Sequence, residues 1–257
     1  MAAGEASVLS MPDEIVLRVT RYRPEQSPLP FHEDFTVPFR NDMMVLDALS
    51  YVKDHMDGSL AFRWSCRMGI CGSCGATVDG VPRLTCETFL YEIPKPIIRV
   101  EPLSHFPVIK DLVVEIDSFM EKLRTVMPWI VRDDQKPLKE GEYRQLPEHV
   151  ELYRQQSLCI NCMICYAGCP VYGLEPEFIG PAALALAYRY NVDTRDHGSK
   201  ERLSRLIGRT GLWECTYVGE CSVVCPKNVD PAGAIQRLKA PGALQAAQVL
   251  LPPILRR

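Results

Sequence analysis

The feature that most constrains this 257-residue chain is a run of four cysteines closed by a proline, Cys159-Ile160-Asn161-Cys162-Met163-Ile164-Cys165-Tyr166-Ala167-Gly168-Cys169-Pro170. Its spacing, C-x2-C-x2-C-x3-C-P, holds iron-sulfur clusters in two-cluster electron carriers. The first three cysteines of such a run bind one cluster and the fourth binds the other, so a second run is required. That second run has Cys215, Cys221 and Cys225, with Val218 where the spacing calls for cysteine. We therefore expect two clusters with one ligand missing.

Crosswise pairing of the two runs assigns the thiolates. The complete set is Cys159, Cys162, Cys165 and Cys225, which we expect to hold [4Fe-4S]. The incomplete set is Cys169, Cys215 and Cys221. Because Val218 offers no donor for a fourth iron, the expected occupant is [3Fe-4S], in which each of three irons takes one thiolate. The alternative is an incomplete [4Fe-4S] with water on its fourth iron.

A third cysteine set lies nearer the N-terminus and comprises Cys66, Cys71, Cys74 and Cys86. Its spacing, C-x4-C-x2-C followed by a distant cysteine, is the plant-type [2Fe-2S] pattern. The neighbouring glycines are Gly69, Gly72 and Gly75. Glycine tolerates positive φ and close approach, so these positions suit a loop that aims backbone N–H groups at cluster sulfurs.

The three sets use all eleven cysteines. Structural zinc, the competing interpretation, needs tetrahedral sets of four and explains neither the set of three nor the prolines after Cys169 and Cys225. The histidines lie outside the cysteine runs and are interpreted as surface or structural residues: His32, His55, His105, His149 and His197. The sequence contains no nucleophile constellation, and no G-x-G-x-x-G motif follows a strand. We therefore expect no catalytic residue, flavin or nicotinamide site on this chain.

Composition narrows the environment and the partners. The start, Met1 to Asp13, lacks the apolar segment of a signal peptide, which favours reduced, metal-bound thiols over disulfides. No apolar run approaches the roughly 18 to 20 residues that cross a bilayer. The net charge of −3, with 24% charged residues, provides no basic field, so nucleic acid is not an expected partner.

Periodicity predicts strands in the first part of the chain and helices in the second. Strands are expected at 15–20, 35–39 and 97–100, with a hairpin at 76–82. A helix capped by Asn41 or Asp42 should follow the second strand, and another should begin near Asp111 with a stripe that includes Met120. Two further helices are expected. Pro181 should lie in the first turn of one, and Ser199 should cap the other.

These patterns predict an α+β fold, with an N-terminal plant-type ferredoxin (β-grasp) domain followed by an α-helical bacterial-ferredoxin-like domain. The expected boundaries are a tail at 1–13, a [2Fe-2S] domain at 14–107, a helix and connecting segment at 108–150, a [4Fe-4S]/[3Fe-4S] domain at 151–239 and a tail at 240–257. Residues 131–148 are polar and proline-containing, as in an extended linker. The final tail is expected to be a mobile terminus, with a surface-lying or partner-packing end as the alternative.

From about Ile15 to Leu238 the chain resembles the iron-sulfur subunit of succinate dehydrogenase and fumarate reductase. The resemblance is carried by the segments 63–74, 159–170 and 225–231, which occur in this order. Two further segments, 178–183 and 189–198, are more similar to the fumarate reductase branch. Sequence type does not fix the direction of a reversible couple, so the dominant direction stays open.

The resemblance implies a complex in which a separate flavoprotein with covalent FAD interconverts succinate and fumarate. Electrons would pass between that FAD and a membrane quinone through the three clusters in sequence. The N-terminal domain would face the flavoprotein, and the three-cysteine end would face hydrophobic anchor subunits. The chain would therefore lie peripherally on the cytoplasmic face of the bacterial cell membrane.

The resemblance also places a quinone beside the three-cysteine loop, near positions that match Pro170, Thr216 and Lys227. Lys227 would stabilise a reduced quinone oxygen, or it is a surface lysine. Val171-Tyr172-Gly173 stands where succinate dehydrogenases often place tryptophan, which favours menaquinone. Two other functions stay open: a subunit of a soluble fumarate reductase without an anchor, and a non-catalytic, metal-stapled interaction module.

Overall fold

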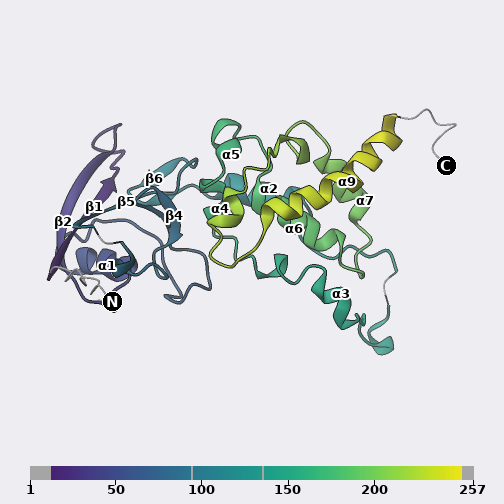
Figure 1. The fold of residues 1–257 in the computed structure, drawn as a ribbon, viewed down its shortest axis with the longest axis horizontal. Coiled ribbons are helices and arrows are strands. Elements are labelled where there is room, and N and C mark those ends of the chain that lie inside the picture. The colour runs from purple at the N-terminus through teal and green to yellow at the C-terminus, as the bar shows by residue number, and fades with distance from the viewer. Residues whose placement is uncertain (1–12, 94, 135, 251–257) are drawn as a thin grey trace, which may run out of the picture. The chain divides into compact units, whose positions relative to one another are not determined.

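The computed structural model describes residues 13–93, 95–134 and 136–250, which form two compact units (Figure 1). The first unit runs to Pro102 and takes in Val108–Val113. The second unit comprises Leu103–Pro107 and continues from Val114. The first unit carries the five-stranded sheet and the second is mainly helical. The chain is therefore mixed α and β, with four cysteines in the first unit and seven in the second.

The first unit is built on a mixed sheet with strand order β2-β1-β5-β3-β4. Its strands are β1 (Glu14–Arg21), β2 (Phe31–Pro38), β3 (Gly75–Val78), β4 (Val81–Leu84) and β5 (Ile97–Glu101). Strands β1 and β5 are parallel and the other neighbours are antiparallel. A parallel pair needs a crossover, and this one carries helix α1 (Val45–His55), the first cysteine loop and the β3-β4 hairpin. The loop is thus held between a helix and a strand.

The core of this unit comes from alternation on β1. Ile15, Leu17 and Val19 are at most 1% exposed and belong to one cluster with Val45 and Leu49 of α1. A strand repeats every two residues and a helix about every four, so each element presents one apolar face. Burying one such side chain contributes about 1.5–3 kcal/mol. The contact between helix and sheet therefore fixes the frame that carries the cysteine loop.

The predicted strands and hairpin of the first unit are confirmed, but the predicted cap of α1 is wrong. The N-cap is Met44, and the carboxylate of Asp47 accepts the Met44 N–H at 3.0 Å. Met44 also forms a β-bridge with Phe89. Asn41 and Asp42 lie in a turn, and the bridge holds Met44 in an extended conformation, so the helix begins later than either residue would place it.

A buried ion pair explains why no helix begins near Asp111. Asp111 has φ +47° and turns the chain between β6 (Val108–Lys110) and β7 (Val113–Val114). Its carboxylate accepts from Nε of Arg21 at 3.1 Å, and both side chains are fully buried. It also accepts the N–H groups of Tyr22 and Ala61. These bonds hold the turn of a two-stranded hairpin at residues 108–114, so the expected helix starts only at Asp117.

Replacing Asp111 with alanine should strongly destabilise the first unit. The change leaves Arg21 with less compensation and orphans two backbone donors, so we expect a loss of about 3 kcal/mol. Urea unfolding of the full chain, followed by far-UV circular dichroism, would measure it. Asp42→Ala is the matched control, because the Asp42 side chain is 77% exposed, and should cost under about 0.5 kcal/mol. Equal unfolding midpoints for the two variants would contradict a structural role for the buried pair.

The second unit is an assembly of short helices around one long helix, α9 (Figure 1). Its α-helices are α2 (Asp117–Thr125), α3 (Pro147–Glu151), α4 (Ile164–Ala167), α5 (Pro170–Leu174), α6 (Pro181–Asn191), α7 (Ser199–Leu206), α8 (Glu220–Val223) and α9 (Pro231–Leu250). The 3-10 helices of the described chain are η1 (Leu90–Glu92), η2 (Leu138–Glu140), η3 (Gln156–Leu158) and η4 (Leu212–Glu214). Helices α6 and α9 pack side by side. The seven cysteines lie in loops and short helices beside this pair.

Several helix predictions for the second unit hold in part. Helix α6 begins at Pro181 as expected. Helix α7 is present, but Gly198 is its N-cap and Ser199 is its first residue. In α2, Met120 is 40% exposed and lies outside the buried face formed by Phe119 and Leu123. Apolar spacing therefore predicts that these helices exist. Their N-caps depend on the hydrogen bonds that neighbouring loops make.

The two predicted tails, 1–13 and 240–257, lie only partly within the described residues. Residues 1–12 of the first tail and 251–257 of the second lie outside the described residues. Helix α9 continues through Pro241 as far as Leu250, so residues 240–250 are helical. Between α2 and α3, residues 131–134 and 136–146 contain only the 3-10 helix η2.

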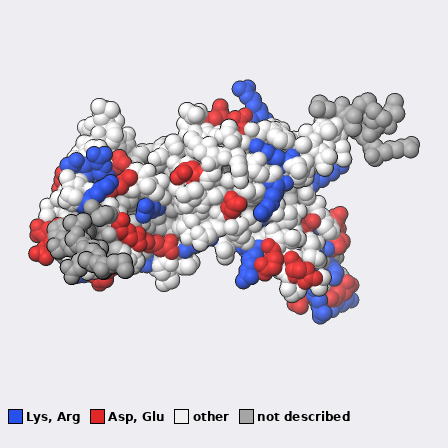
Figure 2. All heavy atoms as spheres, in the orientation of Figure 1, with Lys and Arg blue, Asp and Glu red and all other residues white. Residues whose placement is uncertain are grey.

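Two further features are the character of the helices and the distribution of surface charge. Among the described helices, none combines the length and apolar character needed to cross a membrane. Figure 2 shows Lys and Arg interspersed with Asp and Glu on the visible face of both units.

Candidate iron-sulfur sites

The first cysteine set brings Cys66, Cys71 and Cys74 of the loop between α1 and β3 together with Cys86, which follows β4. The N–H groups of Met68, Ile70 and Cys71 donate to Sγ of Cys66 at 3.5, 3.2 and 3.3 Å. Positive φ angles at Arg67, Gly69 and Gly72 curl the loop so that these donors point inward. Sγ of Cys74 and Sγ of Cys86 lie 3.2 Å apart. Converging sulfurs ringed by N–H donors fit the four-thiolate set of a [2Fe-2S] cluster.

The electrostatics of these thiols differ within the loop. The N–H bonds from Met68, Cys71 and Ile70 lower the pKa of Cys66 to about 6. Burial raises the pKa of Cys86 to about 12. A thiol must lose its proton to bind iron, and here the loop N–H groups favour the thiolate of Cys66 while burial disfavours that of Cys86.

A second set of cysteines lines one small cavity in the helical unit. The cysteines in its wall are Cys159, Cys162, Cys165 and Cys225. Positive φ angles at Asn161 and Met163 fold the first run around the cavity before α4 begins. Burial raises the pKa of Cys162 to about 12 and that of Cys165 well above its usual range. Four thiols, of which Cys162 and Cys165 are buried and Cys159 and Cys225 are partly buried, fit the ligand set of a four-iron cluster.

A third set lines another small cavity in the same unit. Its wall contains Cys169, Cys215 and Cys221, together with Val218. Cys169 is the N-cap of α5, Cys221 lies in α8 and Cys215 is the C-cap of η4, so the ends of three short helices position the three thiols. The side chain of Val218 carries no donor atom. The wall therefore provides three thiols and an apolar group at the position where a fourth ligand would stand.

Sequence similarity decides the family. The chain is 55% identical over 244 residues to the fumarate reductase iron-sulfur subunit of Mycobacterium tuberculosis (strain CDC 1551 / Oshkosh), covering 95% of this chain and 98% of the relative. It belongs to the family of fumarate reductase and succinate dehydrogenase iron-sulfur subunits. Residues 16–121 match the 2Fe-2S iron-sulfur cluster binding domain, and residues 155–229 match the 4Fe-4S dicluster domain. The chain is therefore an electron-transfer subunit of an oxidoreductase complex.

Two further relatives agree with this assignment. A mitochondrial succinate dehydrogenase [ubiquinone] iron-sulfur subunit 2 of Oryza sativa subsp. japonica is 38% identical over 242 residues, which covers 92% of this chain and 78% of the relative. A chain of the Mycobacterium smegmatis Sdh1 complex in the apo form superposes with a TM-score of 0.82 at 28% identity, covering 93% of this chain and 99% of that one. The similarity thus extends through both units of the iron-sulfur subunit.

The structure separates the three residues that the resemblance placed near a quinone. Pro170 and Thr216 line the three-cysteine cavity. Lys227 lines the four-cysteine cavity instead, beside Cys225. Among the described residues, Lys227 thus lies next to the complete cysteine set rather than the incomplete one.

Sequence reasoning missed two residues of α9 that contact Cys215. The side-chain amide of Gln236 lies 3.9 Å from Sγ of Cys215. The ammonium of Lys239 donates to the Cys215 carbonyl at 2.8 Å. The two are three residues apart, so they share one face of the helix. The spacing of these two polar residues, shortly after Cys225-Pro226, is a sequence pattern that could have indicated them. The loop that this face of α9 contacts is decided only by the tertiary structure.

The contact with Gln236 predicts a shift in the potential of the three-cysteine centre. An N–H bond to a ligand sulfur favours the more negative, reduced state, so Gln236→Leu should lower the midpoint potential. A bond worth about 1 kcal/mol corresponds to on the order of 40 mV for one electron. EPR-monitored redox titration of the complex would measure it. Gln245→Leu is the control, because its amide donates to the Lys200 carbonyl. Equal midpoints in both variants would remove the assigned effect.

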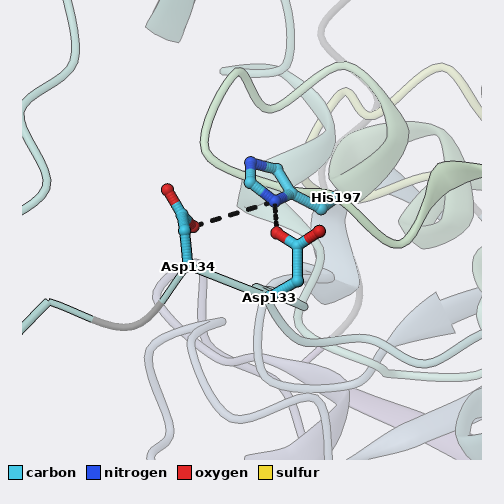
Figure 3. A group of neighbouring side chains, drawn as sticks. All are labelled: Asp133, Asp134 and His197. Atoms are coloured by element: carbon cyan, nitrogen blue, oxygen red, sulfur yellow. Dashed lines mark hydrogen bonds and ion pairs between the residues drawn. The ribbon is translucent and has the colours of Figure 1, made fainter.

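One group of potential metal ligands lies away from the cysteines. Asp133, Asp134 and His197 approach one another at the surface (Figure 3). Nδ1 of His197 contacts the carboxylate of Asp133, and Arg132 pairs with Asp134. All three side chains are exposed, and these partners account for their arrangement without an ion. We interpret this group as a cluster of surface ion pairs.

Proposed function

We propose that this iron-sulfur subunit carries electrons between the FAD of a flavoprotein and a membrane quinone. The observation that carries the proposal is the sharing of cysteines between runs: each of the two cavities in the helical unit takes cysteines from both. The proposed ligands of [2Fe-2S] are Cys66, Cys71, Cys74 and Cys86. Those of [4Fe-4S] are Cys159, Cys162, Cys165 and Cys225, and those of [3Fe-4S] are Cys169, Cys215 and Cys221.

The role of Val218 follows from the chemistry of its side chain. Its position in the wall of the three-cysteine cavity supports an occupant with three irons, since the side chain offers no ligand for a fourth. Clusters of these types accept and release single electrons when bound. The protein residues hold the sulfurs, exclude water through burial, and direct N–H donors at them. These contributions tune potential without any proton transfer.

The fold of each unit supports the finer fold assignment. A mixed sheet packed against α1 supports a plant-type ferredoxin (β-grasp) fold for the first unit. Short helices around two cysteine cavities support a bacterial-ferredoxin-like arrangement for the second. We propose 14–107 and 151–239 as the two cluster domains, although Leu103–Pro107 belong to the second compact unit and Val108–Val113 to the first.

Exposed apolar residues support the two proposed partner faces. Trp64, Met68 and Ile70 belong to the first cysteine loop and are exposed, as a flavoprotein-facing surface requires. Beside the three-cysteine cavity, Tyr217 and Val218 are 60% and 64% exposed. An apolar rim there suits hydrophobic anchor subunits. On this proposal the chain is peripheral to the cytoplasmic face of the bacterial cell membrane.

The proposed quinone is menaquinone, and the proposed branch is fumarate reductase. The branch is supported by the higher identity to the fumarate reductase relative, 55% against 38% for the succinate dehydrogenase relative. Pro170 and Thr216, in the wall of the three-cysteine cavity, support a quinone vicinity there. Lys227 stays in the proposal only as a nearby cation, because it lines the other cavity.

The test is to isolate the complex anaerobically from membranes and record its EPR spectra and activities. We expect three distinct iron-sulfur signals and fumarate reduction driven by a menaquinol analogue. Activity in the soluble fraction without quinol reactivity would instead favour a complex that lacks an anchor. A colourless protein that contains zinc and no acid-labile sulfide would favour a metal-stapled interaction module.

A further inference from the structure

The side chain of Glu87 folds back over the first cysteine loop. Gly69 is buried at φ +66°, and a methyl group added there would lie 1.8 Å from Oε1 of Glu87 and 2.1 Å from its Cδ. The carboxylate therefore occupies the space that any larger residue at position 69 would need. Glycine at this position does more than allow the loop turn, because it lets an acidic group rest against the loop backbone.

This contact brings negative charge close to a ligand sulfur. Gly69, which the carboxylate touches, donates its N–H to Sγ of Cys86 at 3.3 Å. Glu87 also follows Cys86 directly in the chain, and Cys86 is buried. The acid is thus fixed to the segment that wraps the cysteine sulfurs.

We propose that the carboxylate of Glu87 lowers the midpoint potential of the [2Fe-2S] centre held by Cys66, Cys71, Cys74 and Cys86. The inference rests on the proposed function for the identity of that centre. Reduction adds one electron to the cluster, and a fixed negative charge nearby raises the free energy of the reduced state. Gly69 is the positioning residue that makes room for the charge.

The size of the effect follows from distance and exposure. The carboxylate charge and the electron added to the cluster interact with an energy that scales inversely with the dielectric constant and with their separation. Glu87 is exposed, so solvent screens part of its field. We therefore expect removal of the charge to raise the ratio of reduced to oxidised cluster about threefold at a fixed potential. For a one-electron couple this equals about 28 mV.

The experiment is an EPR-monitored redox titration of the whole complex carrying Glu87→Gln. The expected result is an upward shift of the [2Fe-2S] midpoint, with the other two midpoints unchanged. Glu87→Lys should shift it further in the same direction, because it replaces a negative charge with a positive one. Glu25→Gln is the control, since Glu25 is exposed in the turn between β1 and β2, and should leave the midpoint unchanged.

Gly69→Ala tests the geometry of the contact. Its methyl group should displace the carboxylate, so Glu87→Gln should have a smaller effect in the Gly69→Ala background than in the wild type. The same full shift in both backgrounds would overturn the contact as its source. An unchanged or lowered midpoint in Glu87→Gln overturns the inference even if Gly69→Ala does not assemble. A wild-type complex without a [2Fe-2S] signal would overturn the proposed function itself, which separates the two failures.

Discussion

The Val218→Cys variant is expected to lose the oxidised-state [3Fe-4S] EPR signal and to gain a second [4Fe-4S] centre. Val218 lies in the wall of the cavity that Cys169, Cys215 and Cys221 line, so a thiolate there supplies the missing ligand. Adding an iron also moves the potential of the centre, and potentials of iron-sulfur centres span several hundred millivolts with cluster type. We expect the centre to become a poorer electron acceptor and quinol-driven fumarate reduction to fall on the order of tenfold or more, since 59 mV is a factor of ten for one electron.

The matched control for this change is Val218→Ala. It shortens the side chain without adding a ligand, and Val218 is exposed, so assembly should be unaffected. The [3Fe-4S] signal should persist in it. A [3Fe-4S] signal of wild-type intensity in Val218→Cys would show that position 218 does not face the fourth iron site. Analysis of iron and acid-labile sulfide in both variants would distinguish conversion from simple loss of the cluster.

The Cys169→Ala variant is expected to lose the three-cysteine centre while keeping [4Fe-4S]. Cys169 belongs to the first run in the sequence, but the structure places it in the cavity with Cys215 and Cys221. Cys225→Ala should do the reverse, because Cys225 belongs to the second run and lines the cavity with Cys159, Cys162 and Cys165. Removing one thiolate from a three-ligand centre leaves an iron without a protein ligand, so we expect complete loss of the signal and at least a tenfold fall in quinone-linked activity.

EPR of the two variants side by side supplies the decisive comparison. If each run held its own cluster, Cys169→Ala would remove [4Fe-4S] and Cys225→Ala would remove the three-iron centre. Serine substitutions at the same positions keep an oxygen donor and a similar size. They give a second measurement if an alanine variant fails to assemble, since a serine-ligated centre should persist with altered g values and potential.

Local pattern was enough for most secondary structure in the first unit. The alternation of Ile15, Leu17 and Val19 predicted β1 because each strand residue points to the opposite face from the next. The predicted cap of α1 and the predicted start of α2 are wrong for the same reason. Met44 is extended by a bridge to Phe89, and Asp111 is held in a turn by Arg21. Both partners lie more than 40 residues away, where local periodicity carries no information.

The sequence by itself determined the chemistry of the sites, because cysteine count and spacing limit which clusters a loop can wrap, and a valine cannot coordinate iron. It also predicted the sets in which the cysteines would be shared, and ligation itself stays a prediction. Tertiary structure alone decided which other groups lie beside the cysteine sets. Gln236 contacts Cys215, Lys227 lies beside the complete set, and Glu87 rests on Gly69. Such contacts depend on how helices and loops pack, since a side chain meets whatever the fold brings within a few ångströms of it.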